Sequence, residues 1–131
     1  ISAIRFSESR VAPSPSELAA EAARIYALRR RRDTVLPKER FSDPAWDILL
    51  DLFIHATQEK ELPTTSVCIA SAVNATTALR WITTMTEHGA LVRRQDPVDA
   101  RRVFIELSAD SERRIRAFFD EGRAHKAATA S

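Results

Sequence analysis

The stretch Pro63–Leu107, PTTSVCIASAVNATTALRWITTMTEHGALVRRQDPVDARRVFIEL, carries the pattern around which the rest of the chain is organised. Its first part predicts a short apolar helix that begins with Thr64 or Thr65 as the N-cap. A tight turn at Ala72 follows, and Asn74 is a favourable N-cap for a second helix. The first half of the stretch therefore predicts two helices separated by a turn.

The second half of the stretch predicts two strands joined by a charged turn. Gly89 stops the second helix in the left-handed conformation, and residues 90–94 then have the pattern of a strand. Asp96 and Pro97 initiate a turn, and the alternation of apolar and polar residues over 102–107 predicts the returning strand. This order of elements is that of a winged helix-turn-helix, a shape that reads DNA. We therefore predict a mainly α chain with a small two- or three-stranded β wing.

The composition is that of an ordinary globular domain. The 131 residues are 44% hydrophobic and 29% charged, so we expect a single domain over residues 1–131. One cysteine cannot form an internal disulfide, and no apolar run approaches the ~20 residues that cross a bilayer. We therefore expect a cytoplasmic protein with no membrane partner. The net charge is only +2, but arginines cluster at 29–32 and within 93–102, which predicts a local positive face.

A helix is predicted on each side of the winged helix-turn-helix, which spans residues 43–107. The first covers 14–32, with Ser14 as its cap and Pro15 at its first position, and the second covers 108–127. Each helix carries a narrow apolar stripe that needs a partner surface. The two stripes either meet within one subunit or pair with a second copy, and we assign them to dimerisation. These residues are Leu18, Ala22, Ile25, Tyr26, Ile115, Phe118 and Phe119.

Two groups of charged residues lie on the predicted helices. Arg29–Arg32 close the first helix, where they form either a solvated helix end or a contact with phosphate. Asp43 caps the next helix, which is strongly apolar. Asp47 and Asp51 are one turn apart on it, and we interpret them as its exposed edge rather than as a catalytic pair.

The second helix of the motif and the wing carry the candidate DNA contacts. The inward face of that helix is formed by Ala78, Ile82 and Met85. Its outward face has hydroxyls and one arginine, Arg80, which can bond guanine O6 and N7. Arg101 near the wing tip can enter a minor groove, with Asp99 directing it through a hydrogen bond. The alternatives are an ordinary solvated face and a simple charged hairpin. The predicted DNA-binding residues are Asn74, Thr76, Thr77, Arg80, Thr84, Arg93, Arg94, Asp99, Arg101 and Arg102.

The wing sequence resembles a known signature. Residues 96–108, DPVDARRVFIELS, resemble the D-x-x-D-x-R…L-T wing of MarR-type bacterial transcriptional regulators. Upstream, residues 77–82 and 87–94 are similar to the recognition helix of that family and its glycine stop. The resemblance covers about 43–108.

The resemblance implies how such a chain would work. By position, Arg101 matches the wing arginine of the family, Asp99 its supporting aspartate, and Arg80 the arginine of the recognition helix. A homodimer with intertwined N- and C-terminal helices would put its recognition helices in successive major grooves and its wings in the flanking minor grooves. Many members release DNA when a small, often phenolic, ligand binds.

The chain also departs from the family pattern. Ala72 occupies a turn position that is often Gly, and Ser111 stands where Gly is usual. One C-terminal helix is expected where the family usually has two. The dimer therefore either differs in geometry or relies more on residues 18–32.

No residues form a recognisable catalytic or metal-binding pattern. His55, His88 and His125 have no second ligand at metal spacing, so we expect neither an enzyme nor a cofactor. Cys68 is interpreted as a small buried hydrophobe, with a redox sensor as the alternative. We predict a homodimeric, sequence-specific regulator that binds a palindromic site in double-stranded DNA, with a small-molecule effector as a further expectation. The alternative is a winged-helix protein-interaction module.

Overall fold

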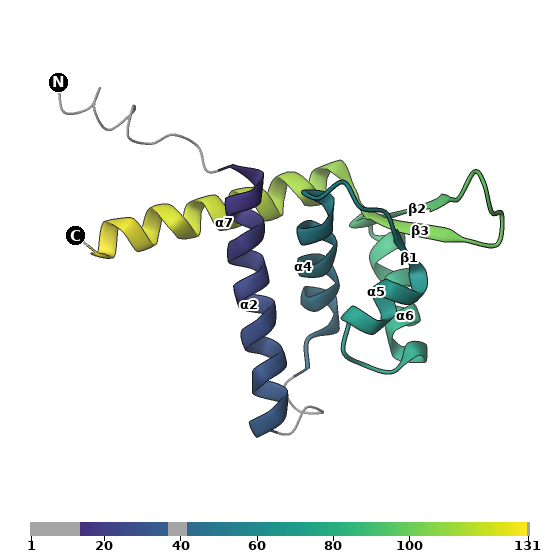
Figure 1. Ribbon diagram of the computed structural model, residues 1–131, viewed down its shortest axis with the longest axis horizontal. Helices are drawn as coiled ribbons and strands as arrows, with labels where there is room; N and C mark the ends of the chain where they lie inside the picture. Colours follow the sequence, from purple (N-terminus) through teal and green to yellow (C-terminus); the bar gives the residue numbers. More distant parts are fainter. Residues whose placement is uncertain (1–13, 37–41, 131) are drawn as a thin grey trace.

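A computed structural model describes residues 14–36 and 42–130, with side chains up to residue 122. The expected connection around Pro37 lies outside the described residues, as do residues 1–13. Within the described ranges, five helices and three strands follow one another (Figure 1). The helices are α2 (Pro15–Val35), α4 (Pro44–Ala56), α5 (Thr64–Ala70), α6 (Ala75–Glu87) and α7 (Ala109–Ala130). The strands are β1 (Leu62–Pro63), β2 (Leu91–Gln95) and β3 (Val103–Leu107). None of these helices combines the length and apolar character that a bilayer span requires.

Side-chain caps begin three of the helices at the predicted positions. Ser14, Asp43 and Asn74 each accept a hydrogen bond from the backbone N–H three residues later. The predicted cap of α5 is wrong, because its N-cap is Pro63 and no side chain caps it. Thr64 Oγ1 instead donates to a carbonyl oxygen of β3, 2.9 Å away. That hydroxyl therefore tethers α5 to the sheet, and is not available to close the start of the helix.

The wing is a three-stranded antiparallel sheet in the order β1-β3-β2. β2 and β3 pair over their whole length, from Leu91 opposite Leu107 to Gln95 opposite Val103. β1 pairs with the other edge of β3 and settles the number of strands at three. A strand of two residues is too short to show alternation, so only the pairing identifies it.

The turn between α5 and α6 has an unusual backbone. Ala72 has a φ of +62°, in the left-handed region that a Cβ disfavours. The buried hydroxyl of Ser71 donates to the carbonyl of Cys68 and accepts from the N–H of Val73. Gly89, with a φ of +81°, ends α6 as predicted.

Two apolar clusters fill the interior, and α4 contributes to both. The first joins α4 to α5, α6 and the sheet. It includes the predicted inward face of α6, namely Ala78, Ile82 and Met85. The second cluster joins α2, α4 and α7. The winged motif and the flanking helices are therefore packed on opposite sides of one central helix, α4 (Figure 1).

The two predicted dimerisation stripes meet in the second cluster, inside one chain. Four of their residues are buried there, namely Leu18, Ala22, Ile115 and Phe119. The stripes therefore pack against α4 within one subunit, and their assignment to dimerisation stays a prediction. Ile25 and Tyr26 pack against the cluster and are half-buried, whereas Phe118 is 55% exposed. Of the seven residues, Phe118 keeps the largest free surface.

Candidate nucleic-acid interface

The outward face of α6 is polar and open to solvent. Asn74 accepts a hydrogen bond from the N–H of Thr77, 2.8 Å away, so both residues take part in the helix start. A shallow depression on the outward face is lined by Thr76, Leu79, Arg80, Thr83 and Thr84. Among the residues that the structure describes, no side chain forms a hydrogen bond or ion pair with the Arg80 guanidinium. Hydroxyls beside a free guanidinium can bond base edges and phosphates in a major groove.

Thr83 connects the recognition helix to the wing. The Nη2 atom of Arg93 in β2 donates to Thr83 Oγ1 over 3.0 Å. This bond holds an exposed guanidinium beside the outward face of α6, where we predicted Arg93 to act. Thr83 was not among the predicted contacts, although it follows Arg80 by three residues on the same helix face.

Asp99 and Arg101 form the predicted pair at the tip of the wing. Arg101 Nε lies 3.1 Å from Asp99 Oδ1, and the backbone N–H of Arg101 donates to the same oxygen. The hydrogen bond from the Arg101 side chain is the main cause that lowers the pKa of Asp99. The Arg101 side chain is still 91% exposed, so the pair directs the guanidinium without covering it.

Two other predicted arginines are engaged within the wing. Arg94 donates to Glu106 and to Glu61, which raises the pKa of Arg94, and its guanidinium lies over the ring of Phe104. Arg102 also lies over the Phe104 ring, with its Cζ atom 5.4 Å from the ring centroid. Arg94 therefore has two carboxylate partners already, and its charge is less available to an external anion than that of Arg93 or Arg101.

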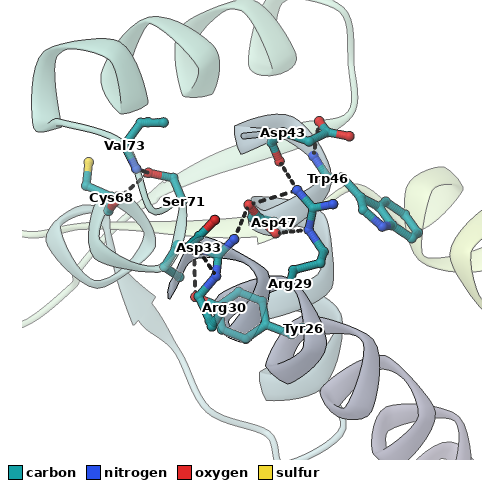
Figure 2. A network of polar contacts seen from close by, with 11 residues as sticks. Tyr26, Arg29, Arg30, Asp33, Asp43, Trp46, Asp47, Cys68, Ser71 and Val73 are labelled. Atoms are coloured by element: carbon teal, nitrogen blue, oxygen red, sulfur yellow. Dashed lines mark hydrogen bonds and ion pairs between the residues drawn. The ribbon is translucent and has the colours of Figure 1, made fainter. Parts of the chain in front are cut away.

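The charged residues of α2 and α4 differ from their predicted roles. Asp47 is completely buried, which overturns its interpretation as part of an exposed edge. Arg29 makes two hydrogen bonds to it, and Arg30 Nη2 donates to Asp47 Oδ2 over 2.9 Å (Figure 2). The Asp51 side chain is only 13% exposed and pairs with His55. Two of the four clustered arginines are thus neither a solvated helix end nor a phosphate contact, because they neutralise a buried carboxylate.

Cys68 is a buried residue of α5, in line with its interpretation as a small hydrophobe. Burial raises the pKa of its thiol, which keeps the reactive thiolate scarce at neutral pH. Among residues 14–36 and 42–122, no three His, Cys, Asp or Glu side chains are grouped so that they could hold a metal ion.

Comparisons with known proteins give a match to structure only. No protein-family model and no curated sequence matches the chain. The crystal structure of the S. aureus MepR–DNA complex is similar over 79% of this chain and 85% of that chain, with 20% identity and a TM-score of 0.54. A probable transcriptional regulator from Pseudomonas aeruginosa is similar over 85% of this chain and 79% of that chain, with 19% identity and a TM-score of 0.51.

These similarities agree with the element order, the sheet topology and the wing. MepR has also been solved in a DNA-binding conformation, which matches 80% of this chain with a TM-score of 0.52. At about one identical residue in five, such a likeness establishes the fold. The chain therefore has the same winged helix-turn-helix fold as MepR and this P. aeruginosa protein.

Proposed function

We propose that this protein is a MarR-type, sequence-specific DNA-binding transcriptional regulator that acts as a homodimer on a palindromic operator. The observation that carries the proposal is the outward face of α6, where Arg80 stands free among threonine hydroxyls. The fold adds support, because MepR, which shares it, has been solved in complex with DNA. The hydrogen bond from Arg93 to Thr83 also places a second exposed guanidinium beside this face. Two cationic groups on one face favour an anionic partner over an ordinary solvated helix.

The proposed DNA contacts divide into two classes. Arg80, Thr76, Thr77 and Thr84 would read base edges in the major groove. Arg93, Arg101 and Arg102 would contact phosphates or enter a minor groove, with Asp99 aiming Arg101. Arg94 contributes least in this scheme, since Glu61 and Glu106 already neutralise it.

The homodimer is proposed on a smaller surface than the sequence predicted. Phe118 is 55% exposed on α7, and its ring contacts the Trp46 ring edge-on at 5.5 Å between centroids. The C-terminal half of α7 extends beyond α2 and leaves the body of the chain (Figure 1). A second copy could cover this half of α7 together with Phe118. Two-fold pairing would then double the DNA contacts, as in other helix-turn-helix dimers.

The test is selection of bound sequences from a random duplex library at near-physiological salt. A homodimeric regulator enriches a palindrome whose half-sites lie about one helical turn, roughly 10 bp, apart. Sedimentation of the complex on the selected duplex then gives the number of subunits bound. An enriched site without two-fold symmetry would retain DNA binding and exclude the palindromic dimer.

The competing function is a winged-helix module that binds another protein. The net charge of +2 favours it over DNA binding more than any other observation does. The two functions differ in salt dependence, because each phosphate contact releases counterions. A log–log slope of about −4 or steeper between 50 and 200 mM salt supports DNA binding through several arginines. A flat slope with no enriched sequence supports the protein-interaction module.

A small-molecule effector remains a prediction from the family resemblance. An open cleft of ≈ 280 Å³ lies at the junction of α4, β1, β3 and α7. Leu52, Leu62 and Ile105 contribute its apolar surface. A screen for ligands that raise the melting temperature and weaken operator binding would test this part of the proposal.

A further inference from the structure

Tyr26 connects α2 directly to the helix-turn-helix. Its hydroxyl donates to the backbone carbonyl of Ala70 over 2.7 Å, across 44 positions of sequence. Ala70 is the last residue of α5, and the last carbonyls of a helix lack a partner within the helix. The phenol therefore occupies an acceptor that would otherwise be left without a protein partner.

The acceptor stands at the start of the turn that leads into α6. Ser71 follows immediately and is completely buried, and Ala72 then takes the left-handed conformation. Asn74, two residues later, caps α6. Only four residues separate the Tyr26 hydrogen bond from the first turn of the recognition helix, and a displacement at Ala70 would change the direction in which α6 leaves the turn.

Tyr26 is itself contacted by Arg30, a residue of α2 that is paired with the buried Asp47 of α4. The guanidinium of Arg30 lies over its ring, 4.9 Å from the centroid, and the same guanidinium donates to Asp47 (Figure 2). Burial raises the pKa of Tyr26, so its hydroxyl keeps the proton that it donates. Asp47, Arg30, Tyr26 and Ala70 thus form a continuous set of contacts from α4 through α2 to α5.

We propose that Tyr26 is a positioning residue for the recognition helix, because its hydroxyl fixes the end of α5 and the turn that aims α6. Its consequence for DNA recognition rests on the function proposed above, whereas its hold on the turn does not. Tyr26 was predicted to serve dimerisation, and the hydrogen bond gives it a second role within one chain.

The test compares Tyr26→Phe with Thr34→Val. The first change removes only the phenol hydroxyl, and the second removes an exposed α2 hydroxyl that bonds the carbonyl of Arg31 within the same helix. Backbone amide hydrogen exchange is measured for Ser71, Ala72 and Thr77, which donate hydrogen bonds in and after the turn. We expect roughly 3- to 10-fold faster exchange there in Tyr26→Phe and wild-type exchange in Thr34→Val.

A second readout separates aiming from simple stabilisation. For each variant, affinity is measured for the selected operator and for the same duplex with the base pair read by Arg80 replaced. We expect Tyr26→Phe to lower the ratio of the two affinities by roughly 3- to 10-fold while non-specific affinity stays at the wild-type value. A purely structural role would change the urea midpoint and leave this ratio unchanged.

The outcomes are distinct. Unchanged exchange in the turn overturns the proposal whatever the DNA results are. Faster exchange with an unchanged affinity ratio overturns the role in recognition. If the wild-type protein prefers no sequence at all, the proposed function fails, and the exchange result alone decides whether Tyr26 holds the turn.

Discussion

Arg29, near the end of α2, donates through both Nε and Nη2 to the two carboxylate oxygens of Asp47, in the first turn of α4. The Asp47 side chain is wholly inside the chain, and the Arg29 side chain is 13% exposed. A bidentate pair of this kind is directional, so it specifies the angle at which α2 crosses α4. The helix that flanks the winged motif is therefore attached to it by charge as well as by the apolar cluster.

Asp47→Ala should lower the free energy of unfolding by about 3–5 kcal/mol, because it leaves two arginines without their buried carboxylate. Urea denaturation measures the change. Asp110→Ala is the matched control, since Asp110 is 56% exposed and pairs with Arg113 and Arg114 on the surface of α7. The control should cost less than about 1 kcal/mol. Similar costs for both variants would mean that the buried pair contributes no more than a surface pair.

Ala72→Gly should stabilise the protein by about 0.5–1 kcal/mol. Ala72 has a φ of +62°, which costs an L-residue about 1–2 kcal/mol, and glycine removes most of that strain at a smaller entropic cost. The same substitution at exposed Ala20 inside α2 should destabilise by about 1 kcal/mol. Urea midpoints of the two variants must shift in opposite directions; a shift in the same direction contradicts the argument.

Arg80→Ala should reduce discrimination at one base pair of the operator by about 1–3 kcal/mol. Fluorescence anisotropy with a panel of single-base operator variants measures it. Arg24→Ala is the control, because Arg24 lies on α2 and pairs with Glu21. Loss of affinity that is equal for every operator variant would make Arg80 a phosphate contact rather than a reader of bases.

Asp99→Asn should weaken binding to operators with A·T-rich flanks by roughly 2- to 5-fold, and Arg101→Ala by more, because the carboxylate only aims the guanidinium. On operators with G·C-rich flanks, the affinities of wild type, Asp99→Asn and Arg101→Ala should differ less. The lowered pKa of Asp99 adds a pH dependence. The stability that the Asp99 carboxylate gains from Arg101 is fully present above the unfolded-state pKa of Asp99 and is lost as pH falls through the lowered folded-state pKa. The pair, and the effect of Asp99 on binding, should therefore persist down to about pH 5. Equal affinities of Asp99→Asn and wild type on A·T-flanked sites would exclude the aiming role.

Cys68 should react slowly with iodoacetamide in the native protein. Its burial limits access, and its raised pKa limits the thiolate fraction, so labelling at pH 8 should be at least about 10-fold slower than in urea. Mass spectrometry of quenched samples follows the reaction. Rapid labelling of the folded protein would instead favour the redox-sensor alternative.

Local chemistry made much of the fold predictable. Gly89 ends α6 in the left-handed conformation, and Asn74 caps its start, because both effects depend on neighbouring residues alone. The pairing of Asp99 with Arg101 could be predicted in the same way, since the two residues are two positions apart in one turn. The DNA-binding roles of the predicted contacts stay predictions until binding is measured.

The errors share one physical cause. From its sequence neighbours, Asp47 was expected at the exposed edge of an apolar helix. Arginines 17 and 18 positions away pair with its carboxylate and offset the free-energy cost of burying it. Thr64 could cap a helix locally, and its hydroxyl is instead used by a strand 39 positions later. Helical spacing does not reveal such partners, because it reports only which residues share a face.

By itself, the sequence determined the order of the elements, the inward and outward faces of α6, and the wing turn, because periodicity, caps and turn residues act over a few positions. Only the tertiary structure decided that the stripes of α2 and α7 meet within one chain, that Asp47 is neutralised inside it, and that Tyr26 reaches the end of α5. Those contacts join segments far apart in the chain, and α4, which contributes to both apolar clusters, lies among them.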